Sequence, residues 1–379
     1  KFLDLPPVNL RNLHLHLTKN PFAGRLPHLC GAALNRRRKS LSVEEKVLEK
    51  VVLGLSDGVD SAVAARVLMD RGYEVHGVYL DIAGADARAD ALASAARLGV
   101  ELQVADIHEE LNRHVCEPFL RAYLAGRTPN PCIGCNPEVK FPSLLRRADE
   151  LGARLIATGH YARCDGQNLY MGNPDNDQSY MLARLRPEQV SRLLLPLGAY
   201  QKKRVREMAA EMGLRVAGKP DSRENCFIRG QTYAEWLESR AAMPGPGAAR
   251  LGDEVIGMHE GIHHYTVGQR WPELWHERRL YVSAIHAESN ELELCLWDEL
   301  FRREFDIANL SFVNGSAPGN EFRAAVRVRH TRWETPACTV VLTEHGAHVV
   351  TDEPVRAPAP GQAAALYDGE RLLGGGYIV

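Results

Sequence analysis

No stretch of this 379-residue chain approaches about 20 uninterrupted apolar residues, so a membrane-spanning helix is not expected. No charge of one sign dominates, because 46 lysines and arginines against 48 aspartates and glutamates give a formal net charge of −2. Any RNA binding must therefore come from local patches. Eight cysteines over this length, two of them as Cys132-Xaa-Xaa-Cys135, favour thiol or metal chemistry in a reducing compartment over a disulfide framework.

The glycine-rich turn at residues 54–61 lacks the Gly-Lys-Ser/Thr ending of a Walker A loop. It reads Gly-Leu-Ser-Asp-Gly-Val-Asp-Ser and directly follows a largely apolar run, which we expect to be a buried strand. A helix is expected to open at Asp60-Ser61. Such a turn points backbone N–H groups and a helix N-terminus at one spot, where an anion is bound well. The hydroxyls of Ser56 and Ser61 add donors, so the turn is predicted to hold a polyphosphate.

Strand-like and helix-like segments alternate from about residue 48 to 165, which indicates a parallel, doubly wound α/β sheet. Ligands bind such a sheet at the carboxyl ends of its strands. The turn at 54–61 and the sequence Thr158-Gly159-His160 both follow such ends. The expected strands are 51–55, 75–82, 101–107 and 154–158, and the expected helices are 61–71, 86–98, 111–124 and 141–151.

The remainder of the chain does not continue the alternation of strands and helices. Residues 186–243 are expected to be mostly helical, with a loop at 218–225. Beyond Pro244, short alternating runs at 281–284, 292–294, 325–328, 339–342 and 348–351 favour one or two small β-barrels. The predicted domains are a basic N-terminal extension (1–47), an α/β domain (48–212), a central domain (213–305) and a C-terminal β-barrel (306–379). A resemblance to a known family, which rests on motifs in these domains, implies ATP binding and catalysis in the second, a second catalytic cysteine in the third and RNA contacts in the fourth.

The N-terminal extension is rich in arginine and poor in acids. Up to Lys39 it carries eight basic residues against one acid, Asp4. One interpretation is the remainder of an organelle-targeting segment, and the other is a solvated tail or an RNA-facing arm. We expect a cytoplasmic protein, with the mitochondrial matrix or another organelle as the alternative.

An ordered series of short motifs accompanies the turn at 54–61. The turn itself resembles the PP-loop of ATP pyrophosphatases, which cleave ATP between its α and β phosphates. With the other motifs, over about residues 48–379, the chain resembles the bacterial and mitochondrial tRNA-specific 2-thiouridylases (MnmA/TrmU family). The motifs are residues 126–136, Val139-Lys140-Phe141, 157–163, 177–180, Asp221-Ser222, Cys226-Phe227-Ile228, 265–270, Pro360-Gly361-Gln362 and 367–376.

The resemblance implies an ATP-dependent reaction on tRNA in two halves. ATP adenylates the C2 oxygen of the wobble uridine, and a sulfur nucleophile then displaces AMP to leave 2-thiouridine. In the persulfide version, Cys226 carries sulfur from a sulfur-relay or cysteine desulfurase donor protein, and Cys135 frees it by forming a disulfide. In a second version, Cys132, Cys135 and Cys226 hold a [4Fe–4S] cluster that binds sulfide. Half a zinc site, a redox pair or three ordinary cysteines also stay open.

The resemblance also implies the binding residues. Mg²⁺ is expected with the pyrophosphate. Asp60 orients the loop or the ion, or caps the helix N-terminus. The residues expected to bind ATP are Gly54, Ser56, Gly58, Val59, Asp60, Ser61, Leu80 and Gly159. The target base is expected near Asn130, Pro131 and Cys132, and other tRNA contacts at His160, Asp177, Gln178, Arg329 and Gln362. Arg327, Arg329, His330 and Arg332 form a basic run that could meet phosphates.

The chain departs from the family pattern at three places that handle ATP or tRNA. Asp57 replaces a glycine of the PP-loop, Asn176 stands where lysine is usual, and Trp271 to Trp275 replace a Lys-Gly-Leu-Gly continuation. An alternative function is therefore a catalytically weakened homologue that serves as an RNA-binding or assembly subunit. Other PP-loop enzymes, such as amidotransferase-type synthetases or thiolases acting on another base, are a further alternative.

Asp57→Gly should tighten ATP binding, because a carboxylate close to a phosphate costs on the order of 1–3 kcal/mol. Titration calorimetry with Mg·ATP checks this expectation. An unchanged or weaker dissociation constant would mean that the carboxylate is accommodated.

Overall fold

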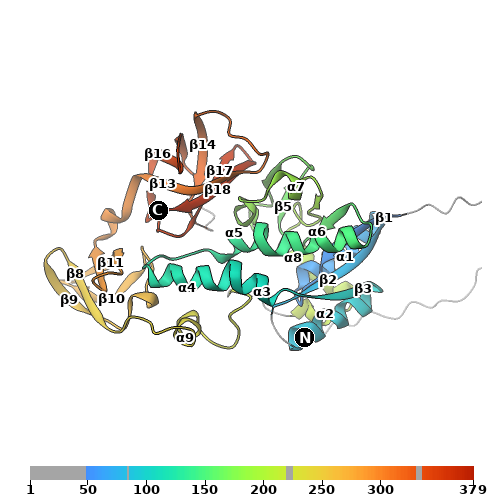
Figure 1. Cartoon of the computed structure of the whole chain (residues 1–379), viewed down its shortest axis with the longest axis horizontal. Coiled ribbons are helices and arrows are strands. Elements are labelled where there is room, and N and C mark those ends of the chain that lie inside the picture. The colour runs from blue at the N-terminus through green and yellow to red at the C-terminus, as the bar shows by residue number, and fades with distance from the viewer. Residues whose placement is uncertain (1–47, 83–84, 219–224, 330–334) are drawn as a thin grey trace, which may run out of the picture. The chain divides into compact units, whose positions relative to one another are not determined.

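The computed structural model describes residues 48–82, 85–218, 225–329 and 335–379. The basic extension, Asp221, Ser222, His330 and Arg332 lie outside the described residues. Residues 48–218 contain the parallel sheet that the sequence predicts, with strand order β3-β2-β1-β4-β7. Its strands are β1 (Glu49–Gly54), β2 (Tyr73–Asp81), β3 (Glu101–Asp106), β4 (Leu155–Ala157) and β7 (Leu193–Leu194). The predicted fold class is therefore confirmed (Figure 1).

Strand β1 lies in the middle of this sheet and is buried on both faces. Val51 and Leu53 pack into one hydrophobic core, together with α1 (Val59–Asp70) and α8 (Lys202–Glu211). Val52, pointing the other way, packs into a second core with α6 (Phe141–Glu150). Successive side chains of a strand point to opposite faces, so an unbroken apolar run is what a fully covered parallel sheet requires.

The helices follow the predictions near the sheet and depart from them elsewhere. The segment expected at 111–124 already begins at His108 and passes through a π-helical turn. Residues 186–243, expected to be mostly helical, contain only short helices in their described part. The other helices are α2 (Ala85–Leu98), α3 (His108–Leu111), α4 (Glu117–Leu124), α5 (Pro131–Cys135), α7 (Pro187–Val190) and α9 (Tyr233–Glu238). Among the described residues, no helix is long and apolar enough to cross a membrane.

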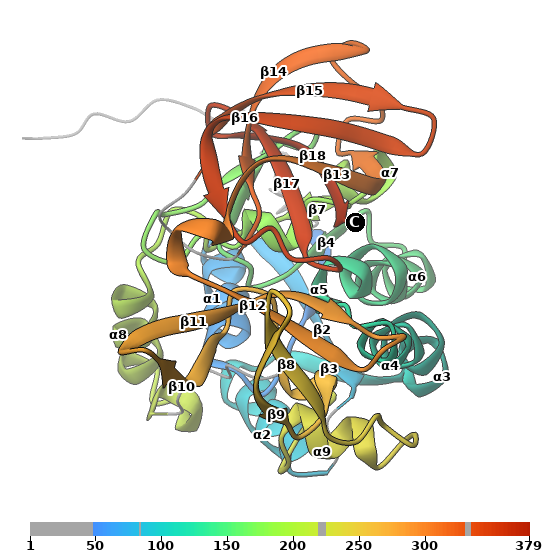
Figure 2. The same cartoon turned by 90° about the vertical axis from the view of Figure 1, so that its left-hand side faces the viewer.

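Two β-structures follow α9, and they confirm the alternating pattern beyond Pro244 (Figure 2). The first has strand order β10-β11-β12-β8-β9. In the second, β13 pairs with both β16 and β18, so that the sheet closes into a barrel. The strands are β8 (Gly247–Leu251), β9 (Glu254–His259), β10 (Arg270–Trp275), β11 (Arg278–His286), β12 (Glu291–Cys295), β13 (Phe301–Phe312), β14 (Glu321–Arg327), β15 (Ala337–Thr343), β16 (Gly346–Arg356), β17 (Ala363–Asp368) and β18 (Arg371–Ile378).

A hairpin from the first half of the chain extends the C-terminal sheet. It consists of β5 (Ala162–Cys164) and β6 (Leu169–Met171), and β6 pairs with β18 through Leu169 and Tyr170. We did not predict this hairpin, because its strands have only three residues each. It begins shortly after β4, so backbone hydrogen bonds join the C-terminal sheet to the carboxyl edge of the parallel sheet.

A buried ion pair reinforces the same junction. Nη1 of Arg327, in β14, lies 2.7 Å from Oδ2 of Asp177, and their side chains are 11% and 7% exposed. Asp177 also accepts hydrogen bonds from the backbone N–H of Gly172 and the hydroxyl of Ser179. Arg327 thus has a structural partner within the chain, and its expected contact with phosphate stays a prediction.

Arg327→Met should lower the free energy of unfolding by about 3–5 kcal/mol, because it leaves the Asp177 carboxylate buried and uncompensated. Chemical denaturation followed by circular dichroism measures the change. Arg323→Met is the matched control, since Arg323 pairs with Asp352 in the same barrel with both side chains more than half exposed. That variant should lose far less stability, because its unpaired partner stays in water. Equal losses in the two variants would contradict the structural role of the buried pair.

Candidate active site

The turn at 54–61 is held together by its two serines. The Ser61 hydroxyl accepts from the backbone N–H of Ser56 at 3.0 Å and lies 3.2 Å from the Ser56 hydroxyl. The Ser56 hydroxyl in turn accepts from the backbone N–H of Gly58 at 3.2 Å. These contacts curl the loop into the N-terminus of α1, which is the geometry that favours an anion.

Asp60 orients this loop and does not cap the helix. The helix begins at Val59, and its N-cap residue Gly58 has no capping side chain, so the N-cap interpretation of Asp60 is wrong. The Asp60 carboxylate instead accepts from Nζ of Lys202 at 2.7 and 2.6 Å and from the Tyr161 hydroxyl at 2.6 Å. These contacts join α1 to the segment after β4 and to the start of α8.

Gly159 allows the segment after β4 to approach this loop. A Cβ at Gly159 would lie 3.0 Å from the backbone carbon of Asp60 and 3.0 Å from the backbone nitrogen of Ser61. Since neither backbone atom can give way cheaply, a larger residue would push the two loops apart.

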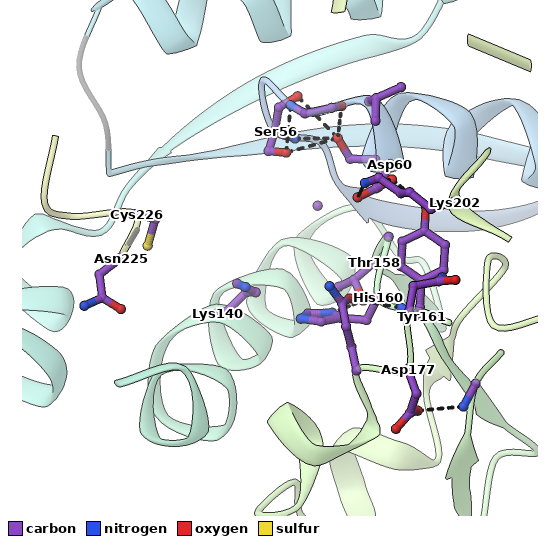
Figure 3. Close-up of a pocket in the computed structure, with 18 of the residues that line it drawn as sticks. Ser56, Asp60, Lys140, Thr158, His160, Tyr161, Asp177, Lys202, Asn225 and Cys226 are labelled. Atoms are coloured by element: carbon purple, nitrogen blue, oxygen red, sulfur yellow. Dashed lines mark hydrogen bonds and ion pairs between the residues drawn. The ribbon is translucent and has the colours of Figure 1, made fainter. Parts of the chain in front are cut away.

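A cavity of about 1580 Å³ opens at this edge of the sheet (Figure 3). Sites for one small molecule usually occupy about 300–1,000 Å³, so there is room for a nucleotide and a second group. The predicted ATP-binding residues all line the cavity, and so do Cys226, His160, Asp177, Gln178 and the barrel residue Arg327. Three cationic side chains that the sequence analysis did not place in the site also line it, namely Lys140, Lys202 and Arg229.

The Cys-Xaa-Xaa-Cys pair lies on α5, the first part of a helical run that continues without a break into α6. The Asn130 side chain caps that helix by accepting from the backbone N–H of Cys132 at 3.2 Å, and Pro131 occupies its first turn. The helical backbone continues past Cys135 through a π-helical turn (Asn136–Lys140) into α6, and Cys135 is 6% exposed. Cys226 is exposed.

Burial sets the protonation of the paired cysteines. It raises the pKa of Cys135 to about 12 and also raises the pKa of Cys132. The positive charge of Lys140 opposes this shift at both thiols, while a charge on Cys226 adds to it. The three sulfurs therefore lie close enough to influence one another, and Cys135 is a protonated thiol at neutral pH.

Lys140 lies between two other residues of the cavity in the view of Figure 3, with Cys226 on one side and His160 on the other. Within the described part of the chain, no carboxylate forms an ion pair with it. Its charge, together with burial as the larger cause, lowers the pKa of His160 to about 3. His160 is thus a neutral imidazole, and its Nδ1 lies 2.8 Å from the Thr158 hydroxyl.

Several residues predicted to contact tRNA already have partners within the chain. The Gln178 side chain accepts from the backbone N–H of Tyr161 at 3.1 Å. Nη2 of Arg329 donates to the carbonyls of Val267 and Ala357, at 2.8 Å in each case. Asp177 belongs to the buried ion pair described above. The tRNA contacts of these residues, and of Gln362, stay predictions.

The three cysteines match a [4Fe–4S] cluster in ligand type. Burial favours the protonated form of two of them, and a cluster would have to overcome this preference. Over the described residues, the one group of metal-ligand atoms lying within 4.8 Å of one another is Glu238, His263 and His264, outside this cavity.

Comparisons with known proteins agree with this architecture. Family models match residues 49–230 (tRNA methyl transferase HUP domain), 239–295 (tRNA methyl transferase PRC-barrel domain) and 302–378 (aminomethyltransferase beta-barrel domain). The tRNA-specific 2-thiouridylase MnmA of Geobacter metallireducens is 36% identical over 365 residues, covering 88% of this chain and 98% of the relative. That of Syntrophotalea carbinolica is 38% identical over 350 residues, covering 86% and 98%.

The chain belongs to the tRNA-specific 2-thiouridylase family. This confirms the resemblance drawn from the ordered motifs. Among solved structures, NMN synthetase from Francisella tularensis matches 50% of this chain and 72% of its own, with a TM-score of 0.33 and 20% identity.

Sequence reasoning missed the cations of the site. Lys140 stands in a quoted motif, but nothing in its spacing indicated a charge facing two thiols. Lys202 lies in a Lys-Lys-Arg run that reads as an ordinary solvated helix start, and Arg229 follows Cys226 by three residues. Their partners are 142 and 172 residues away in sequence, so only the fold brings them together.

At about pH 8, iodoacetamide should modify Cys226 at least about tenfold faster than Cys135, because only a thiolate reacts and Cys135 is buried with a raised pKa. Peptide mass spectrometry of a time course measures both rates in the native protein. The urea-unfolded protein is the control, where the two cysteines should react alike. Equal rates in the native protein would show that Cys135 is accessible and ionised.

Proposed function

We propose that this protein catalyses the ATP-dependent 2-thiolation of the wobble uridine of tRNA. One observation carries the proposal: the anion-binding turn at 54–61 and the exposed thiol of Cys226 border the same cavity. Membership of the 2-thiouridylase family supports the reaction class, since relatives that match nearly their whole length carry that name.

In the first half of the reaction, the loop binds the phosphates of ATP. Backbone N–H groups at the start of α1 and the hydroxyls of Ser56 and Ser61 face the phosphates, and Asp60, held by Lys202, fixes the loop. The C2 oxygen of the uridine attacks the α phosphorus, the bond to the β phosphate breaks, and pyrophosphate leaves. Mg²⁺ bound to the phosphates would offset the charge on the departing pyrophosphate.

In the second half, sulfur displaces AMP. Because Cys226 is exposed, it can receive sulfur from a persulfide-carrying donor protein and hold it as a persulfide. The terminal sulfur attacks C2, and the bond from C2 to the adenylated oxygen breaks. The thiolate of Cys135 then attacks Sγ of Cys226 and breaks the S–S bond, leaving the transferred sulfur on the base and a Cys135–Cys226 disulfide. A dithiol reductant must restore both thiols.

Lys140 supports the step that uses Cys135. Burial keeps this thiol protonated, so it is inert until its proton leaves. The Lys140 ammonium is the cation that favours the thiolate, because it opposes the effect of burial on the pKa of Cys135. If the chain works through a [4Fe–4S] cluster, Cys132, Cys135 and Cys226 would hold it, and the cluster would supply a site for sulfide.

The nucleic acid would enter over the same cavity. We propose that the flipped uracil lies near residues 130–132, next to the buried thiols, and that His160, Gln178 and Gln362 contact the surrounding tRNA. His160 is neutral, so any contact that it makes with RNA is a hydrogen bond rather than an ion pair. Asp177 and Arg329 would support tRNA binding indirectly. Asp177 pairs with Arg327, and Arg329 binds the carbonyls of Val267 and Ala357, so both hold the surrounding elements together.

Cys226→Ala should abolish 2-thiouridine formation while pyrophosphate is still released from ATP and unmodified tRNA, because adenylation precedes sulfur transfer. Nucleoside mass spectrometry of tRNA incubated with protein, ATP and a sulfur donor gives the first readout, and chromatography of nucleotides and pyrophosphate gives the second. Cys164→Ala is the control, because Cys164 is half-buried in β5 and does not line the cavity. Full thiolation by the Cys226 variant would rule out the sulfur-carrying role. Absence of AMP in the native protein would favour the weakened-homologue alternative.

A further inference from the structure

The side chain that departs from the PP-loop pattern faces an arginine. Both terminal nitrogens of Arg229 lie 3.4 Å from Oδ2 of Asp57. The Asp57 side chain is only 16% exposed, so its carboxylate does not simply turn outward into solvent. Arg229 follows Cys226 by three residues, and the ion pair therefore joins the cysteine loop to the nucleotide loop.

The pair changes the electrostatic balance at the loop. Alone, the Asp57 carboxylate would repel a phosphate bound to the same turn. With Arg229 beside it, the two charges cancel, and the guanidinium has donors left over. Arginine carries five N–H donors, and here its contacts go to a single oxygen. Its side chain is 45% exposed and lines the cavity, so the remaining donors are accessible to a ligand.

The other cations of the cavity serve different groups. Lys202 is held by Asp60, and Arg327 is buried against Asp177 at 11% exposure. Lys140 acts on the buried thiols and His160. Among the described cavity residues, Arg229 is thus the half-exposed cation that sits directly at the phosphate-binding turn.

The buried hydroxyl of Tyr79, in the same part of the cavity, has no hydrogen-bond partner among the described residues. Tyr79 lies in β2 and is 3% exposed. Burial raises its pKa, the charge of Asp57 raises it further, and Arg229 lowers it. Tyr79 is therefore a neutral donor within the field of the ion pair. Buried polar groups are nearly always satisfied, which points to a ligand at this corner.

We propose that Arg229 is an ATP-binding residue whose guanidinium donates to a phosphate oxygen of the bound nucleotide and also offsets the charge of Asp57. The proposal rests on the proposed function, because it assumes that the turn at 54–61 binds ATP.

Titration calorimetry with Mg·ATP, without tRNA, tests the proposal on four proteins: the native chain, Arg229→Gln, Asp57→Gly and the double variant. Arg229→Gln should raise the dissociation constant about tenfold or more, since it removes a donor and leaves a carboxylate at the phosphates. Asp57→Gly should bind at least as tightly as the native chain.

The decisive comparison is the double variant against Asp57→Gly. If Arg229 contacts phosphate, its removal should still weaken ATP binding at least about fivefold when no carboxylate is present. If Arg229 only neutralises Asp57, the two should bind alike, and that result would overturn the proposal. Arg229→Lys, which retains the charge, should recover part of the loss.

Arg323→Gln controls for the change in net charge, because it breaks an exposed ion pair in the barrel, outside the cavity, and should leave ATP binding unchanged. Melting temperatures show whether each variant is folded. No ATP binding by the native chain would defeat both the proposed function and this inference. Native binding with equal constants for Asp57→Gly and the double variant would defeat the inference alone.

Discussion

The contact on which the site depends is the one between Asp60 and Lys202. The carboxylate sits in the first turn of α1, and the ammonium comes from the first residue of α8, so a single ion pair fixes the nucleotide loop against a distant helix. The hydroxyl of Tyr161, in the segment after β4, donates a further hydrogen bond to the Asp60 carboxylate. With Gly159 allowing close approach, these contacts hold the backbone N–H groups of the loop in place before any ligand arrives. Such preorganisation is what lets fixed dipoles stabilise charge that develops in a reaction.

Around this fixed point, the fold assembles elements that are far apart in sequence. The β5–β6 hairpin follows the nucleotide edge and pairs with β18, so the C-terminal sheet is attached where the cavity opens. The buried pair of Asp177 and Arg327 strengthens that attachment, and Arg329 adds bonds to the carbonyls of Val267 and Ala357. Each of these buried charges has a direct partner, which reduces the cost of burying it. The C-terminal sheet is therefore attached to the first half of the chain by backbone pairing and by a buried ion pair.

Cys226 and Cys135 differ in exposure, and this difference fits the proposed transfer of sulfur from a donor protein to the base. Cys226 is exposed and can meet a donor protein, whereas Cys135 is buried with a pKa near 12 and is protected from casual oxidation. In the view of Figure 3, Lys140 lies between Cys226 and His160. In the proposed reaction, Cys226 carries the persulfide, and Cys135 releases the transferred sulfur. Cys135 can do so only as a thiolate, after its proton has left.

The local sequence by itself determined the parallel sheet, the glycine- and serine-containing turn at 54–61, the β-rich second half and the family. These follow from apolar runs, glycine and serine spacing, and ordered motifs, all of which act over a few residues. Only the tertiary structure decided the rest: that Cys135 is buried, that Asp60 binds Lys202 instead of capping α1, that Arg327 is buried, and that Asp57 faces Arg229. Each of these depends on partners more than 100 residues away or on burial, and charge pairing over such separations leaves no periodic signal in a chain. From its neighbours in sequence alone, Asp57 suggests impaired ATP binding. In the folded chain, it forms an ion pair with Arg229 of the Cys226 loop.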